Sequence, residues 1–130
     1  TVEHVCGIVA HLSFKGAGVV DRMETLEGRI VQDADRLDAI GAVGVARTFA
    51  YGGHRGRAMH DPEAAPQLHA TFEQYRKAEG TSINHFHEKL LLLKDRMNTP
   101  TARWMAEERH AYMERFLEQF QREWEGQPPV

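Results

Sequence analysis

The sequence has a single cysteine, Cys6, so no disulfide can form within the chain. It has no long apolar run either: the longest nearly apolar stretch, residues 39–46, is far shorter than the roughly 20 residues that a membrane span needs. The opening residues lack the basic segment and apolar run that mark a secretory signal. These absences predict a soluble, cytoplasmic protein with no membrane partner, in which Cys6 is a small core residue.

An excess of positive charge is also missing. The chain has 16 Lys and Arg residues against 19 Asp and Glu residues, and its basic residues are scattered rather than gathered into a stripe. Such a surface argues against a nucleic-acid polymer as a partner. With 42% hydrophobic and 27% charged residues, the sequence is typical of one soluble globular domain over residues 1–130.

The alternating pattern of β-strands is absent too, and apolar residues recur at helical spacing instead. The sequence therefore predicts an all-α helical bundle. The Gly- and Pro-rich residues 52–80 are expected to form a long loop with one short helix near 68–77. The other helices are expected over residues 2–12, from 24 or 25 to 53 with a break at Gly41, from the N-cap Ser82 to 97, and from the N-cap Thr99 and Pro100 to Gly126.

The chain does not begin with methionine, and its first residues already follow a helical pattern. Apolar side chains occur at Val2, Val5, Ile8, Val9 and Leu12, as they would along one helix. We therefore expect that this domain is truncated and lacks an N-terminal half.

Three aspartates lie close together, at positions 33, 35 and 38, in the second expected helix. At roughly 100° per residue, Asp35 and Asp38 project about 60° apart and border the apolar side of the helix. Two like charges at a core boundary repel each other unless a cation, a basic side chain or a proton offsets them. Asp33 projects to the opposite side, where we expect Arg29 and Arg36 to pair with it in solvent. Spacing alone leaves two readings of the pair open, a functional site or a set of structural ion pairs.

Four blocks of sequence carry a resemblance to a known family. They are Gln-Asp-Ala-Asp-Arg-Leu-Asp-Ala-Ile-Gly at 32–41, Ala-Arg-Thr-Phe at 46–49, Ser-Phe-Lys at 13–15 and Thr-Ser-Ile-Asn-His-Phe at 81–86. Together they resemble the C-terminal portion of HD-domain phosphohydrolases, and more narrowly the small bacterial branch of that superfamily. The resemblance covers nearly the whole chain and implies an all-α HD-domain fold.

The resemblance also implies a metal ligand. HD enzymes hold a divalent metal through a histidine, an adjacent His-Asp pair and a distant aspartate in the Ala-Asp-Arg-Leu block, which matches Asp35 here. The other ligands normally lie upstream, and this chain does not contain them. The dipeptide His60-Asp61 follows Asp35 in a Gly- and Pro-rich segment, which does not fit the ligand pair. Nitrogen and oxygen ligands of this kind suit Mn²⁺, Mg²⁺, Fe²⁺ or Ni²⁺.

The activity that the resemblance implies is metal-dependent hydrolysis of phosphate esters or anhydrides of nucleotides or related phosphorylated metabolites. Asp38 would then orient water as a catalytic acid next to the metal, and the alternative is a salt bridge to Arg36 or Arg47. We expect the intact protein to be an enzyme and this chain alone to be inactive.

Four further residues are candidates for contact with the substrate. Lys15 lies in a glycine-rich turn, Arg47 and Arg55 could clamp phosphate groups, and His85 could reach the active-site cleft. Each of them could equally be a structural or surface residue.

A different class of function stays open. The long, aromatic helix expected from Thr99 to Gly126 could belong to a non-catalytic module that docks a partner or forms a homodimer. Such a module would be folded and metal-free, with an oligomeric state that depends on concentration.

Overall fold

The computed structural model describes residues 1–20, 22–77 and 80–129, and all regular elements in these residues are helical. The predicted all-α bundle is therefore confirmed. None of the described helices is both long enough and apolar enough to cross a membrane. The elements are α1 (Val2–His11), α2 (Leu26–Asp38), α3 (Gly41–His54), α4 (Phe72–Lys77), α5 (Ser82–Glu88), the 3₁₀ helix η1 (Leu90–Arg96) and α6 (Pro100–Trp124).

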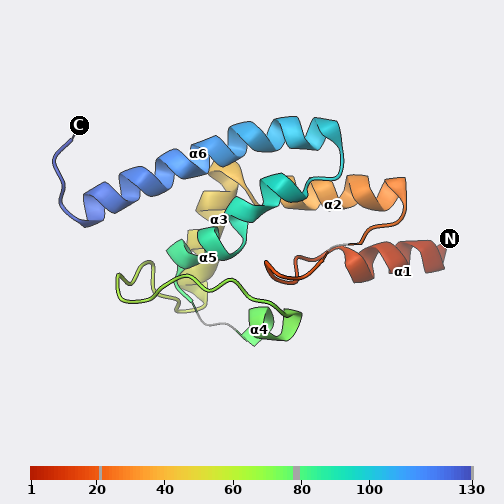
Figure 1. Ribbon diagram of the computed structural model, residues 1–130, viewed down its shortest axis with the longest axis horizontal. Coiled ribbons are helices and arrows are strands. Elements are labelled where there is room, and N and C mark those ends of the chain that lie inside the picture. The colour runs from red at the N-terminus through yellow and green to blue at the C-terminus, as the bar shows by residue number, and fades with distance from the viewer. Residues whose placement is uncertain (21, 78–79, 130) are drawn as a thin grey trace.

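The longest helix, α6, organises the bundle. It runs along one side of the molecule and packs against α3, which crosses beneath it, and against η1 and α2 (Figure 1). Helix α5 lies beside α3 and leads directly into η1. By contrast, α1 buries none of its residues. The body of the fold is thus built from α2, α3, α5, η1 and α6.

The core lies where α3, α5 and η1 meet α6. Phe86, Leu93, Ala106 and Met113 are completely buried there. Burial of large apolar side chains of this kind is worth about 1.5–3 kcal/mol each relative to exposure. These contacts fix α5 against α6 and so set the position of the polar residues that follow on α5.

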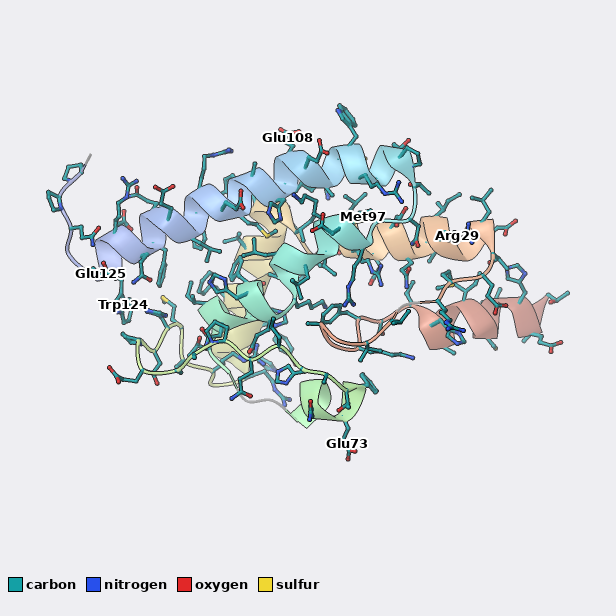
Figure 2. The ribbon with its side chains drawn as sticks, in the orientation of Figure 1. Arg29, Glu73, Met97, Glu108, Trp124 and Glu125 are labelled. Atoms are coloured by element: carbon teal, nitrogen blue, oxygen red, sulfur yellow. The ribbon has the colours of Figure 1, made fainter. Side chains whose placement is uncertain are left out.

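A row of aromatic rings continues from the core to the far end of α6. Phe116, Phe120 and Trp124 lie one helical turn apart. The ring centroids of Phe116 and Phe120 are 6.1 Å apart, and those of Phe120 and Trp124 are 5.8 Å apart. His60 meets this row edge-on, 5.8 Å from Phe120 and 5.0 Å from Trp124. Trp124 lies where the end of α6 meets the loop after α3 (Figure 2). The ring contacts tether one part of the long loop to the bundle.

The helix N-termini follow the expected capping chemistry with one correction. Thr99 caps α6 with Pro100 in the first turn, as the sequence predicts. At α5, however, the N-cap is Thr81 and not Ser82: the Thr81 hydroxyl accepts a hydrogen bond from the backbone N–H of Asn84 at 3.1 Å. Ser82 is instead the first residue of the helix and is buried against Gly52.

The single helix expected over residues 82–97 is wrong. The backbone leaves the α-helical region at Lys89 (φ −138°, ψ −62°), and the chain continues as the 3₁₀ helix η1. With three residues per turn, a 3₁₀ helix brings positions i and i+3 to the same side, and this buries both Leu90 and Leu93. The 3₁₀ helix thus places both leucines in the core.

The expected break at Gly41 is confirmed. Ile40 has an extended backbone (φ −119°, ψ 171°), and Gly41 has a positive φ of 76°. A Cβ atom at Gly41 would also lie 3.0 Å from Cγ of Arg109 on α6. Glycine is needed here both for the backbone conformation and for the close approach of α6.

The expected orientation of α2 is wrong, because its buried side is polar. Gln32, Asp33 and Arg36 are buried, whereas Asp35 and the apolar Ile30 are exposed. This polar side packs against the chain segment between η1 and α6, which offers backbone groups that must be satisfied when they are buried. Hydrogen bonding, and not apolar area, therefore sets the rotation of α2.

Asp33 makes the central contacts of this packing. Its carboxylate accepts four hydrogen bonds, from the backbone and side-chain amides of Asn98 (2.7 and 3.0 Å) and from the backbone N–H and hydroxyl of Thr99 (2.9 and 2.8 Å). Arg36, which lies on the same helix as Asp33, donates a hydrogen bond to the backbone oxygen of Arg96 at 2.6 Å. The carboxylate thus holds the start of α6 against α2.

We expect Asp33→Ala to lower the free energy of unfolding by about 3 kcal/mol, because it leaves several buried donors without an acceptor. Urea denaturation followed by circular dichroism measures this change. Asp35→Ala is the matched control in the same helix: Asp35 is exposed, and we expect a change within about 0.5 kcal/mol. Equal effects of the two substitutions would contradict the structural role given to Asp33.

Candidate functional site

Asp35 and Asp38 lie on the exposed side of α2. They are not partly desolvated at a core boundary, as the sequence suggested, because the buried side of the helix is taken by Asp33 and its neighbours. The Asp38 side chain is 59% exposed and forms an ion pair with Arg47 of α3. Both carboxylates therefore face solvent at the junction of α2 and α3.

The ion pair of Asp38 agrees with the structural alternative for this residue. The hydrogen bond from Arg47 is the main reason why the pKa of Asp38 lies below its usual value, and the nearby charges of Arg47 and Arg109 act in the same direction. Arg36, the other candidate partner, is buried and directed at the backbone of Arg96. The exposed pair contributes little to stability, but it fixes the position of the Arg47 guanidinium.

A cavity of about 370 Å³ opens between α3 and α5 next to this ion pair. A volume of this size falls in the range of small-ligand pockets, about 300–1,000 Å³. The walls combine α3, α5 and parts of the long loop that connects them. The lining residues are Ala39, Gly44, Arg47, Thr48, Tyr51, Arg57, His69, Gly80, Thr81, His85, Glu88, Lys89 and Leu90.

Three cations converge on this cavity: Arg47 from α3, Arg57 from the loop that follows α3, and Lys89 from the end of α5. The side chain of His85 lies among them. Burial, together with the positive charges of Lys89 and Arg57, lowers the pKa of His85 to about 4. At neutral pH His85 is therefore uncharged, and one of its ring nitrogens is free to accept a hydrogen bond.

Lys89 links the cavity to Asp35. Burial is the main reason why the pKa of Lys89 is lowered, and the charge of Asp35 opposes this effect. The Lys89 ammonium also lies 5.9 Å from the ring centroid of Phe14. Asp35 is thus within electrostatic reach of the cation on the cavity wall, although it does not line the cavity itself.

A second pair of titratable groups, His69 and Glu88, also lines the cavity. His69 Nε2 and Glu88 Oε2 are 4.0 Å apart, and both residues are buried. Glu88 also accepts a hydrogen bond from the backbone N–H of Gln67 at 3.0 Å. The carboxylate of Glu88 is therefore held by the loop and turned toward His69.

The structure brings two of the four candidate substrate residues to the cavity. Arg47 and His85 line it. Lys15 lies elsewhere, with its ammonium 5.9 Å from the ring centroid of Phe72. Arg55 is exposed at the C-terminus of α3 and is not part of the cavity wall.

Sequence reasoning missed Arg57, His69, Glu88 and Lys89. For two of them a signal was available: Glu88 and Lys89 lie three and four positions after His85, so they share one face of a helix with it. His69 and Arg57 lie in the long loop, whose path depends on tertiary contacts that no periodic pattern records.

The residues that the structure describes do not by themselves form a complete site for the metal expected from the sequence. Among the residues that the structure describes, no group of three or more His, Cys, Asp or Glu side chains is arranged to hold a metal ion. Asp35 fits only as a single oxygen donor, and one exposed carboxylate does not retain a divalent ion against water. The His60-Asp61 dipeptide is no substitute, because His60 packs on Phe120 and Trp124.

Known proteins share this fold. A protein from Lactobacillus plantarum is 48% identical, with a TM-score of 0.90 over 96% of this chain and 59% of its own. An HD-superfamily hydrolase from Bacillus thuringiensis is 50% identical, with a TM-score of 0.68 over 97% of this chain and 54% of its own. No family model matches the sequence. The chain therefore has an HD-like fold, and HD-superfamily hydrolases are metal-dependent.

A structure of a third relative contains a bound ligand. Bacillus subtilis YpgQ, a curated protein described as uncharacterized, is 40% identical over 125 residues, which make up 95% of this chain and 53% of YpgQ. A structure of YpgQ in complex with ADP matches 76% of this chain and 44% of its own, with 41% identity and a TM-score of 0.61. The chain spans about half the length of the curated relative it matches.

We expect the stability of the chain to depend on the protonation of His85. The pKa of His85 is about 4 in the folded state and about 6.5 when unfolded, so the unfolded state binds more protons between these values. The free energy of unfolding should therefore fall as the pH is lowered from about 6.5 to about 4. Urea denaturation across this range measures the slope. His85→Gln should reduce it, and an unchanged slope would show that other groups cause the dependence.

Proposed function

We propose that this chain is the C-terminal portion of an HD-superfamily phosphohydrolase, a metal-dependent enzyme that cleaves phosphate esters or anhydrides of nucleotides or related phosphorylated metabolites. The observation that carries the proposal is the exposed carboxylate of Asp35 next to a cavity lined by Arg47, Arg57 and Lys89. A carboxylate suits a divalent cation, and converging cations suit a phosphate group.

In this proposal Asp35 is one ligand of a divalent metal ion, and the other ligands come from polypeptide outside these residues. The metal, when bound, would supply an activated water and neutralise charge on the phosphoryl group. The shared fold of the Bacillus thuringiensis hydrolase supports the enzyme class, and the ADP complex of YpgQ supports a nucleotide as the substrate. About half of each relative lies outside the region that matches this chain, which leaves room for the remaining ligands.

The chain's own residues have defined tasks in this proposal. Arg47, held by Asp38, presents its guanidinium at the rim of the cavity and contacts the substrate. His85 stays neutral and offers a hydrogen-bond acceptor. Asp38 acts as a positioning residue for Arg47, and we propose that its effect on turnover runs through that arginine.

We expect the intact protein to release phosphate from nucleotides when Mn²⁺ is added, and the 130 residues alone to be inactive. Asp35→Asn in the intact protein should lower turnover by at least about 100-fold, since even groups that only support a metal ligand are worth about 10–100-fold. Phosphate release measures turnover, and elemental analysis measures the bound metal.

Asp61→Asn is the matched control for this experiment. It makes the same chemical change in the His60-Asp61 dipeptide, which lies away from Asp35 in the loop that packs on α6. Turnover and metal content should stay unchanged in this variant. If Asp35→Asn also left both unchanged, the proposed role of Asp35 would be wrong, and metal-free protein whose oligomeric state changes with concentration would favour an interaction module.

A further inference from the structure

Two cations in the cavity between α3 and α5 form no ion pair with a carboxylate of the described residues. Within the part of the chain that the structure describes, Arg47 pairs with Asp38, but neither Arg57 nor Lys89 forms an ion pair. The carboxylate of Glu88 lies in the same wall, yet it is held by the backbone of Gln67 and turned toward His69. Among the described residues, neither cation is therefore neutralised by a direct ion pair, although the charge of Asp35 acts on Lys89.

Both of these cations are held in place by aromatic rings. The Arg57 guanidinium lies 5.8 Å from the ring centroid of Tyr51, and the Lys89 ammonium lies 5.9 Å from that of Phe14. Ring contacts of this kind restrict a long side chain without neutralising its charge. The two cations are thus pre-positioned for an anion, which lowers the entropy lost on binding.

The remaining lining residues complete an anion site of limited size. Thr81, Tyr51 and the neutral His85 add hydroxyl and imidazole groups that can donate or accept hydrogen bonds. The volume of about 370 Å³ lies near the lower end of the range for small-ligand pockets. It exceeds what a single phosphate group fills, so linked phosphate groups have room in it.

We propose that this cavity binds the phosphate chain of the nucleotide, as a pyrophosphate unit held by Arg57 and Lys89, with Arg47 at the rim. The proposal rests on the proposed function for its substrate, and it assigns two binding residues, Arg57 and Lys89, that the sequence did not single out. Asp35 lies outside the cavity near Lys89, so the phosphate chain extends from the cavity toward that carboxylate.

Binding of inorganic pyrophosphate to the 130-residue chain, without added metal, tests this assignment. Isothermal titration calorimetry should give weaker binding by at least about tenfold in Arg57→Ala and in Lys89→Ala, because each removes a charged hydrogen-bond donor. Arg115→Ala is the matched control: Arg115 is exposed on α6 and does not line the cavity, so binding should change by less than about twofold. Orthophosphate should bind more weakly than pyrophosphate to the unmodified chain.

In a second measurement, a substitution serves only to assign a resonance. NMR titration of His85 with and without pyrophosphate should show its pKa rising from about 4 when the anion is bound, since a negative charge next to the ring favours the imidazolium form. His85→Gln identifies the resonance. A pKa of His85 that is unaffected by saturating pyrophosphate would overturn the assignment, as would equal losses of binding in Arg57→Ala and Arg115→Ala.

The failure of this proposal and that of the proposed function can be told apart. If the intact protein hydrolyses nucleotides while the chain shows no specific pyrophosphate binding, the cavity assignment is wrong and the enzyme class stands. If pyrophosphate binds through Arg57 and Lys89 but the intact protein has no metal-dependent turnover, the cavity is an anion site and the hydrolase proposal is wrong. Asp61→Asn should leave pyrophosphate binding intact, because Asp61 is exposed and does not line the cavity.

Discussion

The buried carboxylate of Asp33 sets the arrangement on which the site depends. It satisfies the backbone amides of Asn98 and Thr99 where η1 ends and α6 begins. Asp33 is the acceptor that the structure gives to both of these amides, so α2 presents Asp33 to them, whatever the apolar pattern of the helix prefers. Once Asp33 faces inward, Asp35, two residues later, is carried to the opposite side and faces solvent.

The break at Gly41 completes this geometry. Its positive φ and the close approach of Arg109 turn the chain sharply between α2 and α3. As a result Arg47 of α3 returns to the exposed end of α2 and pairs with Asp38. The exposed carboxylate of Asp38 thus lies beside an arginine of the cavity wall, because one turn brings the two helices together.

Much of the fold follows from local sequence patterns, but the site does not. The Thr99-Pro100 start of α6 and the break at Gly41 depend on local backbone chemistry, and both could be predicted. The rotation of α2 could not, because Asp33 is buried by partners 65 and 66 residues away. The same holds for Arg57, which reaches the cavity from a loop without periodic structure. Where contacts between distant parts of the chain position a side chain, the spacing of residues in the sequence does not predict its place.

The charges that the fold leaves unbalanced are the strongest physical argument for function. The burial of Lys89 and its nearness to Arg36 both disfavour the ammonium form and lower its pKa. The fold also lowers the pKa of His85, so that its ring is neutral. A chain selected only for stability would replace these groups or pair them with carboxylates, as it does with Asp38 and Arg47. Natural proteins keep such local conflicts mainly where a ligand resolves them. An anion in the cavity would resolve both, because it offsets the charge of Lys89 and makes a proton on His85 favourable.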